Sequence, residues 1–132
     1  MRKRQPASKA ELEIARIVWD LGSATVRQVF EQVDPARELD FKTVQTYLRR
    51  LEAKGYLNTR QNGRSKVYSP KVRPGQVIRE TVDDFLQRLF DGATLPLVQH
   101  LISERDISAN EIQELREMLD RWEQDHGDTQ DK

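Results

Sequence analysis

The sequence of 132 residues contains no cysteine, which excludes disulfides, thiolate metal sites and a cysteine nucleophile. It has two histidines, His100 and His126, and neither has a nucleophile or a metal ligand at motif spacing. A glycine-rich phosphate loop is also missing. We therefore expect a protein that is not an enzyme and that carries no metal and no cofactor.

Long hydrophobic runs are absent as well. No segment approaches the ~20 consecutive apolar residues that a membrane-spanning helix needs, and the basic start of the chain is not followed by the apolar stretch of a secretion signal. We expect a cytoplasmic protein with no membrane insertion.

The net charge is zero, but the two signs are unevenly distributed along the chain. Residues 1–74 carry 16 Lys and Arg against 8 Asp and Glu, whereas residues 75–132 carry 6 against 14. An excess of +8 suits a domain that binds a polyanion, because basic side chains that neutralise phosphates release counterions. Charge alone leaves open the alternative that both sets are solvated faces.

Three helices are expected in the basic part. Capping boxes that begin at Ser8 and Thr25 mark the N-termini of the first two. Asp40 is placed to cap a third helix, from about Phe41 to Lys54, which Gly55 closes.

The third helix has two different faces. At 100° per residue, its apolar side chains cluster on one side, around Val44, Leu48 and Leu51. Lys42, Thr46 and Arg49 cluster on the opposite side, flanked by Thr43, Gln45 and Arg50. One face is therefore expected in the core and the other in solvent, where it can bind a ligand.

Two strands, 56–60 and 65–69, are expected to follow around a tight turn. The pair Asn62-Gly63 is a strong hairpin signal, because both positions of such a turn must accept positive φ. Three basic side chains surround the tip, namely Arg60, Arg64 and Lys66. The Pro74-Gly75 pair ends this region and predicts a hinge.

Three amphipathic helices are expected in the acidic part, the last of them after a capping box at Ser108. Because no sheet follows on which they could bury their apolar stripes, we expect them to need a partner. Folding back onto the first half as a monomer is the open alternative. The apolar residues selected for this surface are Ile78, Val82, Phe85, Leu86, Leu89, Phe90, Val98, Leu101, Ile112, Leu115, Leu119 and Trp122.

Three helices followed by a hairpin are the element order of a winged helix-turn-helix. In this motif one helix reads base edges in the major groove and the hairpin reaches the flanking backbone. We expect a mainly α fold with a small β-hairpin wing: a winged helix-turn-helix DNA-binding domain (1–74), a helical dimerisation region (75–124) and a disordered tail (125–132). The residues expected to contact double-stranded DNA are Lys42, Thr43, Gln45, Thr46, Arg49, Arg50, Arg60, Arg64 and Lys66.

The alternative function is that of a winged-helix adaptor or assembly subunit that binds protein and not DNA. Such modules usually present aromatic or aliphatic anchors on the exposed face. Here Lys42, Thr46 and Arg49 occupy that face, which favours DNA.

Several segments spread over nearly the whole chain carry a family likeness. They are Ala10-Glu11-Leu12-Glu13, Val18-Trp19, Ala24-Thr25-Val26-Arg27, 42–51 (KTVQTYLRRL), 54–57 (KGYL), 63–70 (GRSKVYSP), 97–102 and 107–119. Together they resemble the BlaI/MecI penicillinase-repressor family.

The resemblance implies a homodimer that binds an inverted-repeat operator and blocks transcription, with the helices after the wing interlocking between subunits. It implies base contacts from Lys42, Thr43 and Thr46, and a backbone contact from Arg64 in the wing. In members tied to β-lactam resistance, a membrane sensor triggers cleavage near the position that His100-Leu101 occupies here. This chain lacks the asparagine-phenylalanine pair of those members, which argues against a sensor protease as its inducer.

Overall fold

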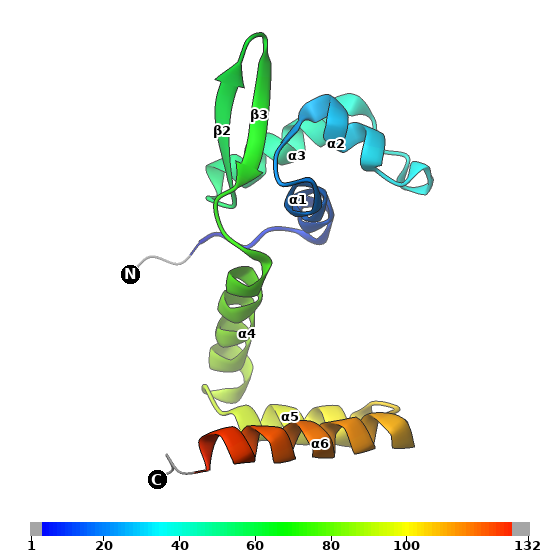
Figure 1. The fold of residues 1–132 in the computed structure, drawn as a ribbon, viewed down its shortest axis with the longest axis vertical. Helices are drawn as coiled ribbons and strands as arrows, with labels where there is room; N and C mark the ends of the chain where they lie inside the picture. Colours follow the sequence, from blue (N-terminus) through cyan, green and yellow to red (C-terminus); the bar gives the residue numbers. More distant parts are fainter. Residues whose placement is uncertain (1–3, 128–132) are drawn as a thin grey trace. The chain divides into compact units, whose positions relative to one another are not determined.

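The computed structural model describes residues 4–127 (Figure 1). Its elements in chain order are α1 (Lys9–Leu21), β1 (Ala24–Thr25), α2 (Val26–Gln32), the 3-10 helix η1 (Pro35–Arg37), α3 (Phe41–Ala53), β2 (Leu57–Asn62), β3 (Ser65–Pro70), α4 (Pro74–Phe90), α5 (Thr94–Glu104) and α6 (Ala109–His126). They form two compact units that divide between Phe85 and Leu86. The predicted fold class, mainly helical with a small β-hairpin, is confirmed.

The predicted helix starts are present. Ser8, Thr25 and Ser108 each form a complete capping box, in which the side chains at the N-cap and three residues later exchange hydrogen bonds with each other's backbone. Asp40 caps α3 by accepting a hydrogen bond of 2.8 Å from the Thr43 N–H. Because these caps satisfy N–H groups that have no partner inside the helix, they determine where the helices begin.

The core of the first unit lies where α1, α2, α3 and the sheet meet. Its fully buried side chains come from all of these elements: Ile14, Val18, Val29, Val44, Leu48, Leu51, Leu57 and Tyr68. Burying an aliphatic side chain of this size contributes about 1.5–3 kcal/mol. This packing holds the three helices and the hairpin together as one body.

The sheet has three antiparallel strands in the order β1-β3-β2. The hairpin of β2 and β3 is confirmed. The short strand β1 was not predicted, because two residues are too few to show the alternation of a strand.

The turn of the hairpin differs from the predicted one. Asn62 pairs with Ser65, so the two loop residues are Gly63 and Arg64. Gly63 has a φ of +64°, and Asn62 is not among the residues with positive φ. The prediction that Asn62 and Gly63 both take positive φ is therefore wrong. The strand pairing continues through Asn62, and glycine fills the first central position, as a type II′ turn requires.

The α4 helix begins at Pro74, where a hinge was expected. Proline suits the first turn of a helix, because the N–H that it lacks would have no partner there. Val77 is buried in the core of the first unit, so this unit extends beyond Pro74. The assignment of residues 1–74 to DNA binding and 75–124 to dimerisation stays a prediction.

The end of the chain was expected to be a disordered tail over residues 125–132. Asp125 and His126 are the last residues of α6, and the His126 ring stacks on Trp122 with 4.1 Å between ring centroids. Residues 128–132 lie outside the described part of the chain.

The second unit comprises the end of α4 with α5 and α6. Among the described residues, none in α5 or α6 is buried. Large apolar side chains on these two helices are instead exposed to solvent: Leu95, Val98, Leu101, Ile102, Leu115, Met118, Leu119 and Trp122. The helix faces that were predicted to need a partner are therefore uncovered in the single chain.

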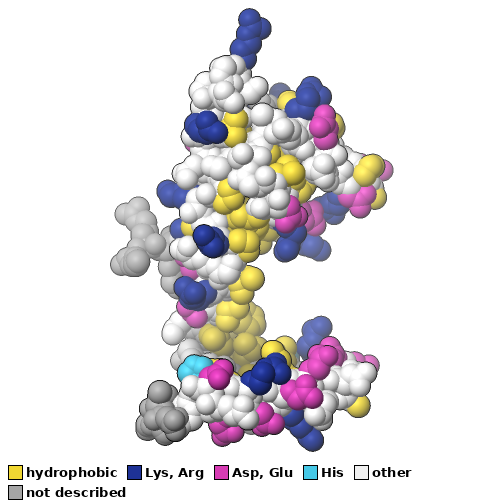
Figure 2. All heavy atoms as spheres, in the orientation of Figure 1, with side chains coloured by type: hydrophobic (Ala, Val, Ile, Leu, Met, Phe, Trp, Pro, Cys, Tyr) yellow, Lys and Arg dark blue, Asp and Glu magenta, His cyan; other side chains and the backbone are white. Residues whose placement is uncertain are grey.

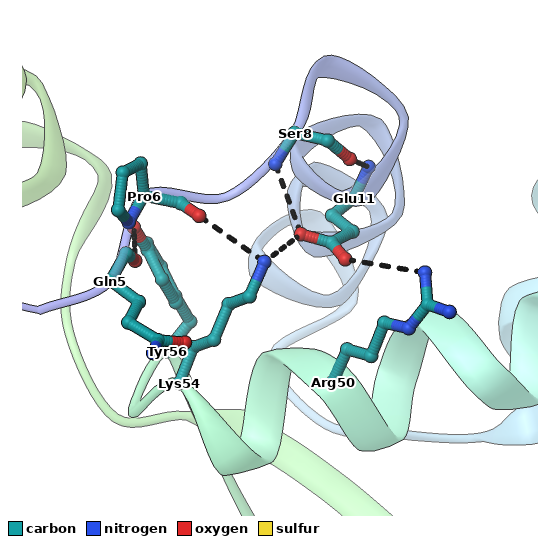
Figure 3. Close-up of polar contacts among 7 residues, drawn as sticks. All are labelled: Gln5, Pro6, Ser8, Glu11, Arg50, Lys54 and Tyr56. Atoms are coloured by element: carbon teal, nitrogen blue, oxygen red, sulfur yellow. Dashed lines mark hydrogen bonds and ion pairs between the residues drawn. The ribbon is translucent and has the colours of Figure 1, made fainter.

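One carboxylate, that of Glu11 on α1, is buried in the first unit with only 2% of the residue exposed. Its Oε1 accepts hydrogen bonds from Lys54 Nζ at 2.7 Å and from the Ser8 N–H at 3.0 Å (Figure 3). Its Oε2 lies 3.9 Å from Arg50 Nη1. Lys54 also donates to the Pro6 carbonyl, at 3.2 Å. Glu11 thereby ties α1 to the end of α3.

Burial by itself raises the pKa of Glu11, because it disfavours the charged form. The hydrogen bonds from Lys54 and Ser8, together with the charges of Lys54 and Arg50, outweigh burial and hold the pKa below its ordinary value. A carboxylate whose pKa is lower in the folded than in the unfolded state stabilises the fold above the unfolded pKa. That contribution is lost as the pH falls through the folded pKa.

We expect Glu11→Gln to lower the free energy of unfolding by about 1.5 kcal/mol at pH 7, because the capping box survives with glutamine while the charged contacts to Lys54 and Arg50 are lost. The difference from the unsubstituted protein should shrink below about pH 4, where Glu11 becomes protonated in the unfolded chain and then in the folded one. Urea unfolding followed by circular dichroism, at pH 7 and pH 3 and one protein concentration, measures this. Glu13→Gln, which removes the exposed ion pair with Arg37, is the matched control. A loss that is equal at both pH values contradicts the assignment.

Candidate nucleic-acid interface

The α3 helix presents the two faces that its sequence predicts. Val44, Leu48 and Leu51 are completely buried, which fixes the rotation of the helix about its axis. On the rest of its surface Lys42, Arg49 and Arg50 are exposed, and Thr43, Gln45 and Thr46 are partly exposed. All six predicted side chains are therefore accessible to a ligand.

The N-terminus of α3 is stabilised by its N-cap residue, Asp40. The Asp40 carboxylate accepts from the backbone N–H of Thr43 at 2.8 Å, and these hydrogen bonds to Thr43 hold the pKa of Asp40 below its usual value. Because Asp40 engages both the backbone N–H and the hydroxyl of Thr43, the Lys42 ammonium is the donor that the first turn offers to a ligand.

Arg50 differs from the other cations of α3. Its Nη1 lies 3.9 Å from the buried Glu11 carboxylate, so part of its charge is directed toward α1. Lys42 and Arg49 have no acidic side chain within 4 Å among the described residues. Within the predicted set, these two cations are more available to a polyanion than Arg50.

The hairpin carries the three basic residues that were predicted for a wing. Arg64 lies in the two-residue loop at the tip, and Gln61 Nε2 braces that loop by donating to the Gly63 carbonyl at 3.3 Å. Arg60 pairs with Val67, whereas Lys66 pairs with Gln61. Since directly paired residues point to the same face and successive residues alternate, Arg60 and Lys66 lie on opposite faces of the ribbon. The three cations therefore do not form one cluster.

The hairpin is fixed to α3 by a side-chain contact at its base. Thr59 Oγ1 on β2 donates to Glu52 Oε2 on α3 at 2.8 Å, and the two elements pack against each other. The wing and the exposed face of α3 consequently belong to the same compact unit. In the view of Figure 2, Lys and Arg side chains are scattered over the first unit, one of them at the tip of the hairpin, and Asp and Glu are frequent over α5 and α6.

One cation beside α3 was not selected from the sequence. The Arg27 guanidinium of α2 lies 5.4 Å from the centre of the Phe41 ring, and that ring meets Phe30 edge to face at 5.7 Å. The aromatic ring orders the guanidinium through a cation–π contact next to the first residues of α3. No pattern in the sequence indicates this contact, because it joins two different helices.

Among residues 4–127, no three His, Asp or Glu side chains are arranged to hold a metal ion. In the same range no helix has the length and apolar character to cross a bilayer. What the α3 surface offers is hydrogen-bond donors and positive charge.

Comparison with known proteins decides the family. Residues 7–121 match the family model described as "Penicillinase repressor". The chain belongs to the penicillinase repressor family. The predicted resemblance is confirmed.

Two curated relatives align with nearly the whole length of this chain. The penicillinase repressor of Bacillus licheniformis is 32% identical over 120 residues, which is 91% of this chain and 94% of the relative. The methicillin resistance regulatory protein MecI of Mammaliicoccus sciuri is 27% identical over 119 residues, 90% of this chain and 97% of the relative.

Among solved structures, this chain is similar to the DNA-binding domain of the repressor BlaI, whose structure was determined in solution. The likeness covers 56% of this chain and 90% of that domain, with 35% sequence identity and a TM-score of 0.50. The winged helix-turn-helix predicted from the order of helices and hairpin is thereby confirmed. Which of its side chains contact DNA stays a prediction.

We expect Lys42→Ala and Thr46→Ala each to weaken binding to the operator by about 1–3 kcal/mol, since both remove a donor from the exposed face of α3. Fluorescence anisotropy with the operator, found by sequencing the genomic fragments that the purified protein retains, measures the change. Arg16→Ala, which removes an exposed cation from α1, is the control and should bind as the unsubstituted protein does. If both α3 variants keep full affinity, this helix is not the reading element.

Proposed function

We propose that this penicillinase repressor family member is a transcriptional repressor, not an enzyme, that binds an inverted-repeat operator as a homodimer. The main support for the proposal is that α3, in a winged helix-turn-helix of this family, presents Lys42, Thr46 and Arg49 on its exposed face. Its place of action is the cytoplasm, where the DNA is accessible to it.

The chemistry of the α3 face suits duplex DNA. Lysine and arginine donate to the O6 and N7 atoms of guanine, glutamine can pair with adenine, and threonine offers both a hydroxyl and a methyl group that can contact thymine. Arg64, at the exposed tip of the wing, is suited to a phosphate of the backbone. In this proposal α3 reads the sequence and the wing fixes the register.

The uncovered helices of the second unit support the homodimer. Val98 and Leu101 on α5 and Leu115, Leu119 and Trp122 on α6 are all between 37% and 68% exposed. So much exposed apolar surface on amphipathic helices is typical of a protein–protein interface. A second copy of the chain is the partner that the proposal names, because a twofold dimer presents two identical heads to the two half-sites of an inverted repeat.

The acidic character of the second half fits the same arrangement. A region with a net charge of −8 is repelled by DNA phosphates. It therefore keeps the dimerisation helices off the duplex and leaves the contact with DNA to the basic first unit.

Induction by cleavage is not part of the proposal. His100-Leu101 lies inside the α5 helix, so a protease acting there would first have to unfold that segment. The sequence of this pair already departs from that of the members in which a sensor triggers cleavage.

A salt titration separates the repressor from a protein-binding adaptor. We expect the logarithm of the operator association constant to fall by about 0.9 for each tenfold increase in salt and each phosphate neutralised, because counterions are released on binding. Anisotropy measured from 50 to 300 mM KCl gives the slope, and a shuffled duplex gives the non-specific slope. Affinity that does not respond to salt, or no binding to any duplex, would falsify the DNA-binding function.

We expect Leu115→Asp and Leu119→Asp to shift the protein from dimer to monomer, because each places a charge in the proposed apolar seam of α6. Sedimentation equilibrium gives the dimer dissociation constant, which should rise by at least about tenfold, as a loss of 1.4 kcal/mol implies. Gln113→Asp adds the same charge at an exposed polar position of α6 and should leave the constant nearly unchanged. A dimer that tolerates both leucine replacements is not held by this surface.

A further inference from the structure

The Arg27 side chain projects into solvent from the first turn of α2. That helix begins at the capping box of Thr25, and Thr25 also pairs with Val67 in the sheet. Val29, two residues after Arg27, is completely buried, which fixes the rotation of α2 about its axis. Because residues two positions apart point to nearly opposite sides of a helix, Arg27 is directed away from the core, and it is exposed.

The Phe41 ring holds the Arg27 guanidinium beside the start of α3. The central carbon of the guanidinium lies 5.4 Å from the centre of the ring, within the range of a cation–π contact. Phe41 is the first residue of α3, and the Phe30 ring meets it at an angle of 71° with 5.7 Å between centroids. Phe30 is partly buried against the core. Two rings thus connect the core to a cation on the surface.

An aromatic partner leaves the charge of Arg27 uncompensated. A cation–π contact neither neutralises a guanidinium nor occupies its N–H donors, whereas an ion pair such as that of Arg37 with Glu13 does both. Among residues 4–127, no carboxylate lies within 4 Å of the Arg27 guanidinium, not even that of Glu31 one turn further along α2. Arg27 therefore combines a held position with a full positive charge.

The position of Arg27 suits the sugar-phosphate backbone of DNA better than a base. In a helix-turn-helix the second helix enters the major groove, and the helix before it crosses the backbone. Here α2 precedes α3 and packs against it (Figure 1). The planar donors of an arginine match two oxygens of one phosphate. A guanidinium that is already held in the free protein loses less conformational entropy on binding.

We propose that Arg27 binds a phosphate of the operator backbone, and that the Phe41 ring is the group that positions it. The inference rests on the proposed function, because it needs α3 to lie in the major groove. It adds a contact from α2 to those proposed for α3 and the wing. Since all of these groups belong to the first unit, the contact concerns one copy of the chain on one half-site.

The test uses the full-length protein and two duplexes of equal length, the operator and a shuffled sequence, in fluorescence anisotropy from 50 to 300 mM KCl. The variants are Arg27→Ala, Phe41→Leu, Phe41→Tyr and the double variant Arg27→Ala with Phe41→Leu. Arg16→Ala, which removes an exposed cation from α1, is the matched control. Thermal unfolding followed by circular dichroism reports on the fold of each variant. Arg27→Ala shortens only an exposed side chain, so it tests the phosphate contact even if Phe41→Leu lowers the stability.

Arg27→Ala is expected to weaken binding to both duplexes by a similar factor, about tenfold at low salt, because every sequence presents the same phosphates. The slope of the logarithm of the association constant against the logarithm of the salt concentration should become shallower by about 0.9, the share of one phosphate. Arg16→Ala should change neither the affinity nor the slope.

Phe41→Leu is expected to weaken binding by about two- to fivefold, the factor that corresponds to an exposed cation–π contact. In the Phe41→Leu protein, the further loss caused by Arg27→Ala should be smaller than in the unsubstituted protein by that same factor, since the ring acts through Arg27. Phe41→Tyr keeps an aromatic ring and should keep the affinity.

Four results would overturn the inference or its premise. Full affinity of Arg27→Ala for both duplexes shows that Arg27 does not bind DNA. A loss confined to the operator, with an unchanged salt slope, shows that it reads a base. Losses from Arg27→Ala and Phe41→Leu that combine independently show that the ring does not position Arg27. An unsubstituted protein that binds neither duplex refutes the proposed function itself, and this is seen before any variant is measured.

Discussion

The burial of Val44, Leu48 and Leu51 determines which side of α3 meets the solvent. These three side chains are completely enclosed by α1, α2 and the sheet, and a helix that commits one face to a core cannot turn without exposing it. The opposite face, with Lys42, Thr46 and Arg49, is thereby held outward. The Asp40 cap sets the first residue of the helix, and the contact between Glu11 and Lys54 anchors its last turn to α1. The surface that we propose for reading DNA is thus a consequence of how the core packs.

The two halves of the chain differ in whether their apolar side chains are buried. The first unit buries a core of apolar side chains within itself, although Ile78, Val82 and Phe85 at its α4 end stay exposed. The second unit has no buried residue in α5 or α6 and leaves leucine, valine and tryptophan side chains open. A hydrophobic face without cover is costly in water, and in the proposed homodimer a second copy of the same chain covers it. In the proposed repressor, the opposite net charges of the two halves keep DNA reading and dimerisation on separate surfaces, and α4 connects the two units.

Much of this could be predicted from the sequence because the decisive signals are local. Capping boxes at Ser8, Thr25 and Ser108, and the spacing of apolar residues in α3, depend on neighbours three or four positions away. The features that were missed join distant residues: the burial of Glu11 beside Lys54, the ring of Phe41 under Arg27, and the contact of Arg4 with Glu80. The turn was misjudged by one residue, since the sequence motif Asn62-Gly63 does not show that pairing continues through Asn62. A proline that could end a region or begin a helix is equally ambiguous, and in α4 it begins one.

Repression as proposed requires two copies of the chain to act together on one duplex. The most direct measurement is the number of chains bound to the operator, determined by sedimentation velocity or native mass spectrometry of the complex near physiological salt. Two chains on the inverted repeat, assembled from a dimer that already exists without DNA, is the predicted result. A saturated complex with a single chain would contradict the account.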